Sequence, residues 1–314
     1  MDEKRRAKGG TYAFRTGQPL GPEYFVPQRP AAGSRRVELA FDALRLGVDG
    51  LDDALAEALV ERYGPYVRTS PSAEPPALEV RVAREARDYF IEPPAAAEFN
   101  PVWLAVQGSR VSFLGYRLAG WFDVKGARGE MLLAGGAYEP ELRAIENYIR
   151  CAVAWCAAES GGALVHSASI VRNGKAYLFF GESGAGKSTL SAADTEGRVV
   201  SDDLSLLLPR PGGGLDLVGS PFRGTYEEGD PVVGRFPLAA GFRIVKDVRA
   251  EVRKAPRALV FGQLVANLTF VAEAFNVRPD LFASIDAAFS SVPLHHLHFR
   301  KDDSYWDAID AAGL

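Results

Sequence analysis

The chain has 314 residues, of which 47% are hydrophobic and 24% are charged, with a net charge of -4. This composition is typical of a globular protein with one large domain or two modest ones. The acidic balance gives no general attraction to nucleic acid or to an anionic membrane surface, so we expect neither as a partner. The N-terminus has no apolar run behind its charges, and no apolar segment reaches membrane-spanning length, so we expect a cytoplasmic protein.

The first part of the chain divides into two predicted segments. Residues 1–35 are rich in Gly, Pro and Arg and show no lasting periodicity, which predicts an extended arm. Residues 36–137 mix two patterns: residues 51–63 have helical spacing, whereas residues 78–82 and 103–106 alternate or run apolar. This mixture predicts an α+β N-terminal region.

The third predicted segment, residues 138–314, opens with an amphipathic helix from about residue 140 to residue 159. Beyond that helix the pattern changes to strand, turn, strand, helix, strand, which is typical of an α/β sheet that carries a nucleotide-binding turn. Cys151 and Cys156 lie in the helix at a spacing that suits neither a disulfide nor a zinc site. We expect both cysteines to be small buried hydrophobic residues.

A phosphate-binding motif follows the apolar run at residues 176–180. The sequence there matches G-x-x-x-x-G-K-[ST] in full: Gly181-Glu182-Ser183-Gly184-Ala185-Gly186-Lys187-Ser188. In this motif the glycines let backbone N–H groups close around phosphate oxygens, Lys187 supplies charge to the β and γ phosphates, and the Ser188 hydroxyl can ligate Mg²⁺. A Gly-rich turn without this function would leave the lysine and the serine unexplained. We therefore predict that the chain binds a nucleoside triphosphate with magnesium.

Two adjacent acids, Asp202 and Asp203, end a short β-branched strand at residues 198–201. One carboxylate can hold Mg²⁺ directly or through water, and the other can accept the proton of an attacking hydroxyl. Adjacent side chains on an extended backbone point to opposite faces, so both acids can face the phosphate only if a turn ends the strand. The alternative is a solvated turn without a role in chemistry.

A histidine is expected beside the motif. Strand patterns at residues 163–171 and 176–180 flank a turn whose Asn173-Gly174 pair is a strong hairpin signal. Pairing of these strands would place His166 near the nucleotide end of the sheet, where it can hydrogen-bond an aspartate and tune its basicity. The alternative is a structural imidazole.

One arginine, Arg223, lies in a Gly/Pro loop shortly after the two acids. An arginine at this point can neutralise charge on a transferring phosphoryl group. The equal alternative is that Arg223 is a loop residue held by a surface carboxylate.

In order and approximate spacing, these residues resemble the HPr kinase/phosphorylase catalytic domain, and more closely the HPr-kinase-related proteins of bacteria. The resemblance covers about residues 160–230, with motifs at His166-Ser167-Ala168, residues 181–188, Ser201-Asp202-Asp203 and Arg223-Gly224. It implies a P-loop core similar to the nucleotide domain of phosphoenolpyruvate carboxykinase, with a mixed sheet and flanking helices. It also implies ATP-dependent phosphorylation of a serine hydroxyl on a protein or peptide.

The resemblance implies a role for each matching position. Asp202 corresponds to the base that faces the acceptor hydroxyl, His166 to the partner of that base, and Arg223 to the phosphate-contacting arginine. Asp203 and Ser188 correspond to the residues associated with Mg²⁺. The implied ATP-binding set is Gly181, Glu182, Ser183, Gly184, Ala185, Gly186, Lys187, Ser188 and Thr189.

Two positions depart from the family pattern. Thr189 follows Ser188 where HPr kinases usually carry an acid, and Phe222 precedes Arg223 where their signature has Ile-Arg after a Glu. These departures leave the acceptor and the phosphorylase activity open, and the oligomeric state is open as well. Two other functions fit the same motifs: a kinase of a small hydroxyl compound or amino acid, and an ATP-binding regulatory or scaffold protein without an acceptor.

The C-terminal stretch from residue 257 alternates helical runs with a strand pattern at residues 294–299 that holds His295, His296 and His298. Neighbouring side chains on a strand face opposite ways, and no cysteine lies nearby to complete a metal site. The pattern therefore favours structural histidines.

Overall fold

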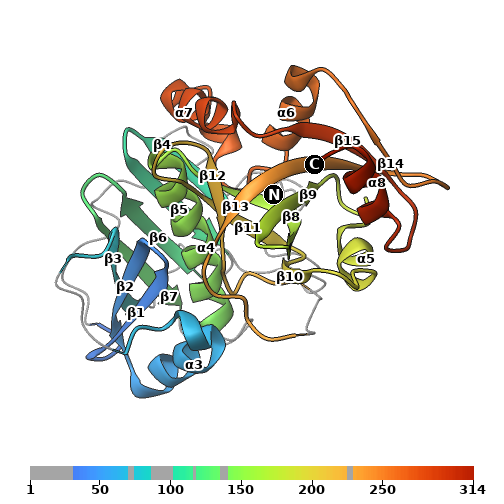
Figure 1. Ribbon diagram of the computed structural model, residues 1–314. Coiled ribbons are helices and arrows are strands. Elements are labelled where there is room, and N and C mark those ends of the chain that lie inside the picture. Colours follow the sequence, from blue (N-terminus) through green and yellow to red (C-terminus); the bar gives the residue numbers. More distant parts are fainter. Residues whose placement is uncertain (1–30, 70–73, 86–101, 116–117, 135–140, 225–228) are drawn as a thin grey trace, which may run out of the picture. The chain divides into compact units, whose positions relative to one another are not determined.

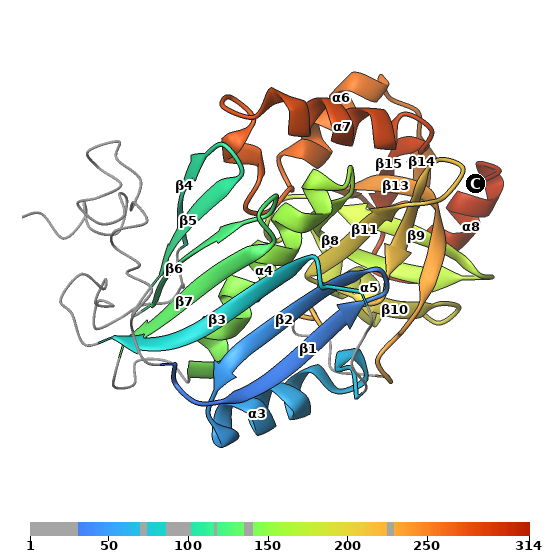
Figure 2. The ribbon, with the colours of Figure 1, turned by 90° about the vertical axis from the view of Figure 1, so that its left-hand side faces the viewer.

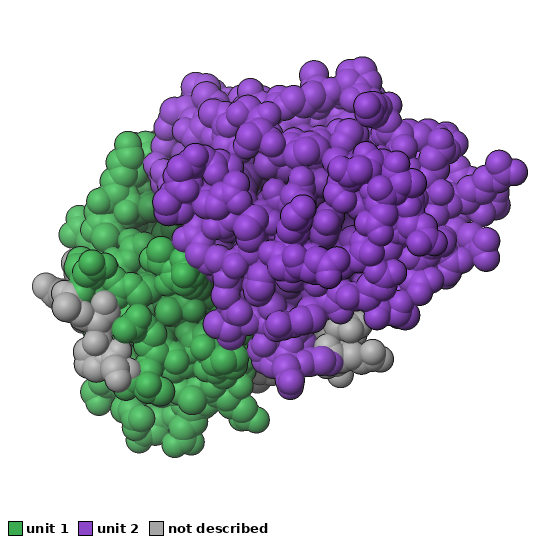
Figure 3. All heavy atoms as spheres, viewed as in Figure 1, with its two compact units in different colours: residues 1–156 green, residues 157–314 purple. Residues whose placement is uncertain are grey.

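The computed structural model describes residues 31–69, 74–85, 102–115, 118–134, 141–224 and 229–314 (Figure 1). The predicted arm lies almost entirely outside the described residues. The chain forms two compact units, residues 1–156 and 157–314, which Figure 3 colours separately. The division falls inside helix α4 (Glu141–Glu159), whereas the sequence-based boundary at residue 138 lies just before this helix. Helices and sheets occur together in the chain, which confirms the mixed α/β class.

A seven-stranded mixed sheet forms the base of the first unit. Strands β2, β3 and β7 run parallel to one another, and the other neighbours are antiparallel. Helix α3 (Asp53–Tyr63) provides the crossover that the parallel pair β2 and β3 requires, and it packs beside β1 (Figure 2). In sheet order the strands are β1 (Arg35–Phe41), β2 (Leu44–Leu51), β3 (Leu78–Glu85), β7 (Arg128–Ala134), β6 (Leu118–Asp123), β5 (Arg110–Gly115) and β4 (Trp103–Gln107).

Helix α3 begins at Asp53 because the side chain of Asp52 caps it. The carboxylate of Asp52 accepts a hydrogen bond from the backbone N of Leu55 at 2.9 Å, which satisfies one of the unpaired N–H groups of the first turn. Leu55, Leu59 and Tyr63 are buried at a spacing of four residues, as expected for one face of a helix. The predicted helix and both predicted strands of this region are confirmed.

Helix α4 packs through its aromatic residues onto the sheet of the first unit. Tyr148 stacks edge-on against Phe122 with ring centroids 5.7 Å apart, and its hydroxyl donates to the carbonyl of Trp121 at 2.6 Å. A Cβ at Gly120 would lie 2.8 Å from the Tyr148 ring, so this strand position admits only glycine. The predicted helix therefore has a specific packing partner, which its amphipathic pattern did not identify.

A closed ring of five strands forms the centre of the second unit. Around the ring the order is β8 (Ala163–Arg172), β11 (Leu204–Pro209), β12 (Leu215–Val218), β13 (Arg235–Lys246) and β9 (Lys175–Phe180). The ring closes because β9 also pairs with β8 through a hairpin, whose turn residues Asn173 and Gly174 both have left-handed φ angles, 52° and 74°. This hairpin confirms the prediction made from the Asn-Gly pair.

The described part of the second unit has three further strands, the α-helices α5 to α8 and a short 3-10 helix at Ala272–Ala274. Strand β10 pairs with β8, β15 runs parallel to β13, and β14 pairs with β15. Figure 1 shows α6 and α7 at the top of the view and α5 and α8 on its right-hand side. The bounds are β10 (Arg198–Ser201), β14 (Glu251–Arg253), β15 (Leu294–Phe299), α5 (Lys187–Ala192), α6 (Arg257–Val265), α7 (Pro279–Phe289) and α8 (Tyr305–Ala311).

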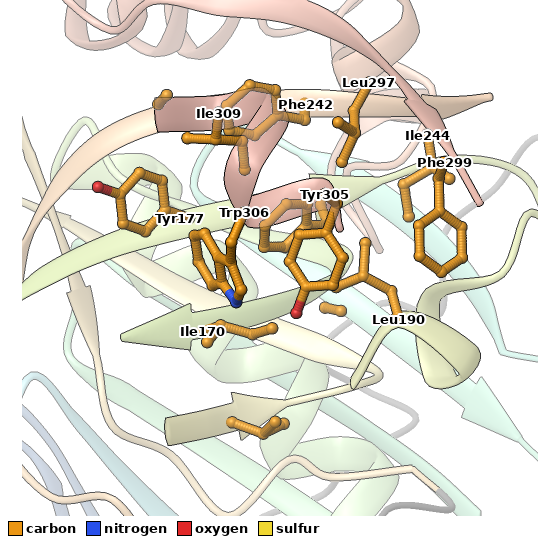
Figure 4. Close-up of a cluster of buried hydrophobic side chains, with 14 residues drawn as sticks. Ile170, Tyr177, Leu190, Phe242, Ile244, Leu297, Phe299, Tyr305, Trp306 and Ile309 are labelled. Carbon is orange, nitrogen blue, oxygen red and sulfur yellow. The ribbon is translucent and has the colours of Figure 1, made fainter. Parts of the chain in front are cut away.

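A cluster of buried apolar side chains holds α5 and α8 against the strands (Figure 4). Leu190 comes from α5, Tyr305 and Trp306 come from α8, and Phe179 comes from β9. The polar atoms of the two α8 aromatics are satisfied by one carboxylate, because Asp194 accepts from the Tyr305 hydroxyl at 3.0 Å and from the Trp306 indole at 2.8 Å. The cluster thereby fixes the short helix that begins at Lys187.

Cys151 and Cys156 are both free and buried, as their positions in the sequence predicted. Burial raises the pKa of the Cys151 thiol well above its ordinary value, so this thiol is protonated at neutral pH. Among the described residues, no helix combines the length and the apolar character needed to cross a bilayer.

Candidate functional site

The predicted phosphate-binding loop lies between the end of β9 at Phe180 and the start of α5 at Lys187. Gly184 and Gly186 have φ angles of 77° and 112°, in the left-handed region that side chains with a Cβ rarely adopt. A Cβ at Gly184 would meet no atom within 4 Å, so open space borders this part of the loop. The strand, loop and helix occur in the order that the motif predicts.

Lys187 reaches back across its own loop. Its ammonium nitrogen donates to the carbonyl oxygens of Gly181 at 3.0 Å and Glu182 at 3.4 Å. Burial lowers the pKa of Lys187, and the charge of Asp203 opposes this effect. The site therefore holds a partly desolvated ammonium group, which a bound anion would stabilise.

The two acids lie in the turn between β10, which ends at Ser201, and β11, which begins at Leu204. The Ser201 hydroxyl organises this turn: it donates to the Phe222 carbonyl at 2.6 Å and accepts from the backbone N of Asp203 at 3.1 Å. The turn that the sequence argument required for both carboxylates to face one site is present.

Asp202 is the more buried of the two acids, with 3% of its surface exposed. One of its carboxylate oxygens, Oδ1, accepts a hydrogen bond from the backbone N of Gly224 at 2.7 Å. The backbone of Asp203 is fixed on the other side, because its carbonyl accepts from the backbone N of Ser167 at 2.9 Å. Two long-range backbone contacts thus orient the pair.

His166 lies beside this turn, as the hairpin predicted. Its Nε2 atom is 3.6 Å from Oδ1 of Asp203, and its pKa is lowered by burial and by the charge of Lys187, with Asp203 acting in the opposite direction. The resemblance implies that the histidine is the partner of the base Asp202, whereas in the structure the carboxylate beside its Nε2 atom is that of Asp203. A predominantly neutral imidazole at this position can donate to or accept from that carboxylate.

Arg223 contacts backbone atoms of its own loop, which connects β12 to β13, and of β10. Its guanidinium donates to the carbonyl of Gly229 at 3.0 Å and to that of Asp230 at 2.8 Å, and its Nε donates to the carbonyl of Val200 at 3.4 Å. These bonds join the end of β10 to the loop. A contact between Arg223 and phosphate remains a prediction.

Arg243 lies beside the predicted loop, although its sequence pattern did not single it out. It lies on β13, and its Nη2 atom is 3.3 Å from Oε1 of Glu182 in the predicted phosphate-binding loop. The available signal was an arginine between Phe242 and Ile244, both of which are buried. Sequence alone could not place Arg243 beside the loop, because that contact depends on the pairing of β13 with β9.

The oxygen donors near the loop suit Mg²⁺ better than a softer metal. Ser188 is exposed at the start of α5, and the carboxylates of Asp203 and Asp202 lie close enough to Lys187 to oppose the lowering of its pKa by burial. Within the described residues, no three His, Cys, Asp or Glu side chains gather as a metal cluster. Mg²⁺ commonly takes one or two protein oxygens and completes its shell with water and substrate phosphates, and this donor set fits that mode.

The three C-terminal histidines lie within four consecutive residues of β15. His296 lies 2.9 Å from the Gln263 amide oxygen through Nε2, and His298 lies 2.7 Å from an Asp247 carboxylate oxygen through Nδ1. These contacts account for both rings in structural terms.

No protein-family model matches the chain. No curated protein matches it either.

Proposed function

We propose that the protein is an ATP-dependent kinase that transfers the γ-phosphate to a serine hydroxyl of a protein or peptide. The observation that carries this proposal is the position of Lys187. This residue is buried in its own loop and interacts electrostatically with Asp203 and Asp202. Phosphoryl transfer needs a cation that binds the phosphates of the donor and a carboxylate that accepts the proton of the acceptor, and this combination of one cation and two carboxylates supplies both. The strand β9, the loop and helix α5 further support a P-loop core similar to that of HPr kinase.

The residues of the loop and of the acid turn have separate roles in the proposed reaction. Lys187 and the loop N–H groups hold the phosphates, and Ser188 and Asp203 ligate Mg²⁺. Asp202, held through Oδ1 by Gly224 N, accepts the proton of the acceptor hydroxyl. Bound Mg-ATP supplies the phosphoryl group, which passes from the bridging oxygen to the acceptor oxygen and leaves ADP.

Incubation with ATP labelled at the γ-phosphate tests the proposal directly. Serine-containing proteins and peptides are offered as acceptors, with free serine as a small-molecule comparison. Label on protein or peptide supports the proposed function, whereas label on free serine alone identifies a small-molecule kinase. Release of label only to water contradicts the kinase proposal and favours an ATP-binding regulatory protein.

The assignment of the base needs a pair of variants. We expect Asp202→Asn to reduce transfer by about 10²- to 10⁴-fold, because the amide cannot accept the proton, while Mg-ATP affinity stays within a few-fold. The matched control is Asp307→Asn, which changes an exposed acid on α8 and leaves transfer intact. If Asp203→Asn loses transfer with nucleotide binding retained and Asp202→Asn does not, the base is the acid beside His166.

A further inference from the structure

Arg243 lies level with the start of the phosphate-binding loop. Strand β13 runs parallel to β9, and the register places Arg243 opposite Phe180, the last strand residue before Gly181. On its other side Arg243 is opposite His296 of β15. The pairing of three strands therefore fixes the backbone of this arginine beside the loop.

The guanidinium of Arg243 packs against the first two residues of the loop. A Cβ at Gly181 would lie 2.8 Å from its Nη1 atom, so the end of the guanidinium lies directly beside this glycine. Nη1 also donates to the backbone carbonyl of Ile244, and Nη2 is 3.3 Å from the carboxylate of Glu182. The charge of Arg243 reaches Lys187, whose pKa it lowers.

The carboxylate partner of Arg243 is readily exchanged. The side chain of Glu182 is 88% exposed, whereas that of Arg243 is only 17% exposed. An ion pair with so exposed a carboxylate contributes little, because water and salt screen it. Arginine stays charged at every accessible pH, and its planar fork matches phosphate oxygens in a bidentate geometry.

Lys187 and Arg243 are like charges close to the same loop, so each makes the charged state of the other less favourable by electrostatic repulsion. A polyphosphate relieves this repulsion because it offers negative charge to both groups at once. We propose that Arg243 is a phosphate-binding residue of this site, and that it exchanges Glu182 for a phosphate of the nucleotide. This inference rests on the proposed binding of ATP to the loop.

Calorimetric titration of the full chain with Mg-ATP tests the exchange. We expect Arg243→Gln to weaken binding by about ten-fold or more, because a charge-assisted contact is lost. Arg243→Lys keeps the charge without the fork, and we expect an intermediate affinity. The matched control is Arg253→Gln on β14, where the arginine pairs with Glu251. The Mg-ATP affinity of this variant should equal that of the unaltered protein.

Glu182→Gln provides an independent measurement that does not depend on a partly buried position. We expect it to bind Mg-ATP a few-fold more tightly than the unaltered protein, because the carboxylate that competes for Arg243 is gone. Weaker binding by Glu182→Gln overturns the exchange, and unchanged binding by a folded Arg243→Gln overturns the role of Arg243. Failure of the unaltered protein to bind Mg-ATP is a different result, because it contradicts the proposed function itself.

Discussion

The ammonium nitrogen of Lys187 lies 3.0 Å from the carbonyl oxygen of Gly181, so the lysine of the loop motif closes onto the first residue of that motif. Burial lowers the pKa of Lys187, which means that its charge is partly desolvated in the folded protein. We expect Lys187→Met to abolish Mg-ATP binding, because the main cation of the loop is removed. The same variant should keep or raise the melting temperature, since the cost of burying the charge is also removed.

Titration calorimetry and thermal denaturation of the same samples check both parts of this prediction. Lys175→Met is the control, because Lys175 is exposed at the opposite end of β9. A large loss of thermal stability in Lys187→Met would show that the lysine serves the fold rather than the ligand.

Gly224 lies close to both acids, and we expect Gly224→Ala to disturb them. A Cβ at this position would be 3.1 Å from the Asp203 Cβ atom and 3.2 Å from both carboxylate oxygens of Asp202, so at least one acid must shift. Phosphoryl transfer should fall on the order of ten- to a hundred-fold, because small misplacements of reacting groups are costly. Mg-ATP affinity should change much less.

Gly262→Ala is the matched control for this change. A Cβ there would meet no atom within 4 Å, and the position lies inside helix α6. We expect full activity and a gain of about 0.5–1 kcal/mol in the free energy of unfolding, because alanine favours the helix. Normal transfer by Gly224→Ala would contradict the placement of the acids in the reaction.

The Ser201 hydroxyl holds the turn that carries both acids. Ser201→Ala leaves the Phe222 carbonyl and the N–H group of Asp203 without this partner in a buried site. We expect the free energy of unfolding to fall by about 1–3 kcal/mol, as measured by urea denaturation. Ser205→Ala should cost less, because the Ser205 hydroxyl makes only a 3.3 Å bond to Ser167 O; equal costs would refute the special role of Ser201.

The stability contributed by the cap of helix α3 should depend on pH. The hydrogen bond from the backbone N of Leu55, with help from Arg84, lowers the pKa of Asp52 below its ordinary 3.8. A carboxyl with a lowered pKa adds stability above its ordinary value and loses it as the pH falls through the lowered value. We therefore expect the stability difference between the unaltered protein and Asp52→Asn to shrink below about pH 3.8.

Urea denaturation followed by far-UV circular dichroism at several pH values measures this difference. Asp52→Ala should cost about 1 kcal/mol at neutral pH, and Asp52→Asn should cost less, because asparagine also caps helices. Asp49→Asn on an exposed position of β2 serves as the control. A difference that persists unchanged into strong acid would mean that the charge of Asp52 contributes nothing.

Local patterns in the sequence were sufficient to predict several elements of the fold. The helix at residues 51–63, the Asn173-Gly174 hairpin and the loop between β9 and α5 were predicted because each depends on residues close together in the chain. A turn at Asp202 and Asp203 was expected on the condition that both carboxylates face one site, because side chains alternate along a strand. The chemical roles of these residues remain predictions.

Tertiary structure alone decided which distant segments meet at the loop. Closure of the five strands brings Arg243 to Glu182 and joins β13 to β9, although 61 positions separate the two residues. Gly224 and Phe222 reach the acid turn in the same way, through contacts with Asp202 and Ser201. Propensity and periodicity act over a few residues, whereas these contacts depend on strand pairing and on the burial of apolar side chains across the whole unit. The sequence by itself was enough to predict the loop between β9 and α5, and the tertiary structure determined which charges surround it.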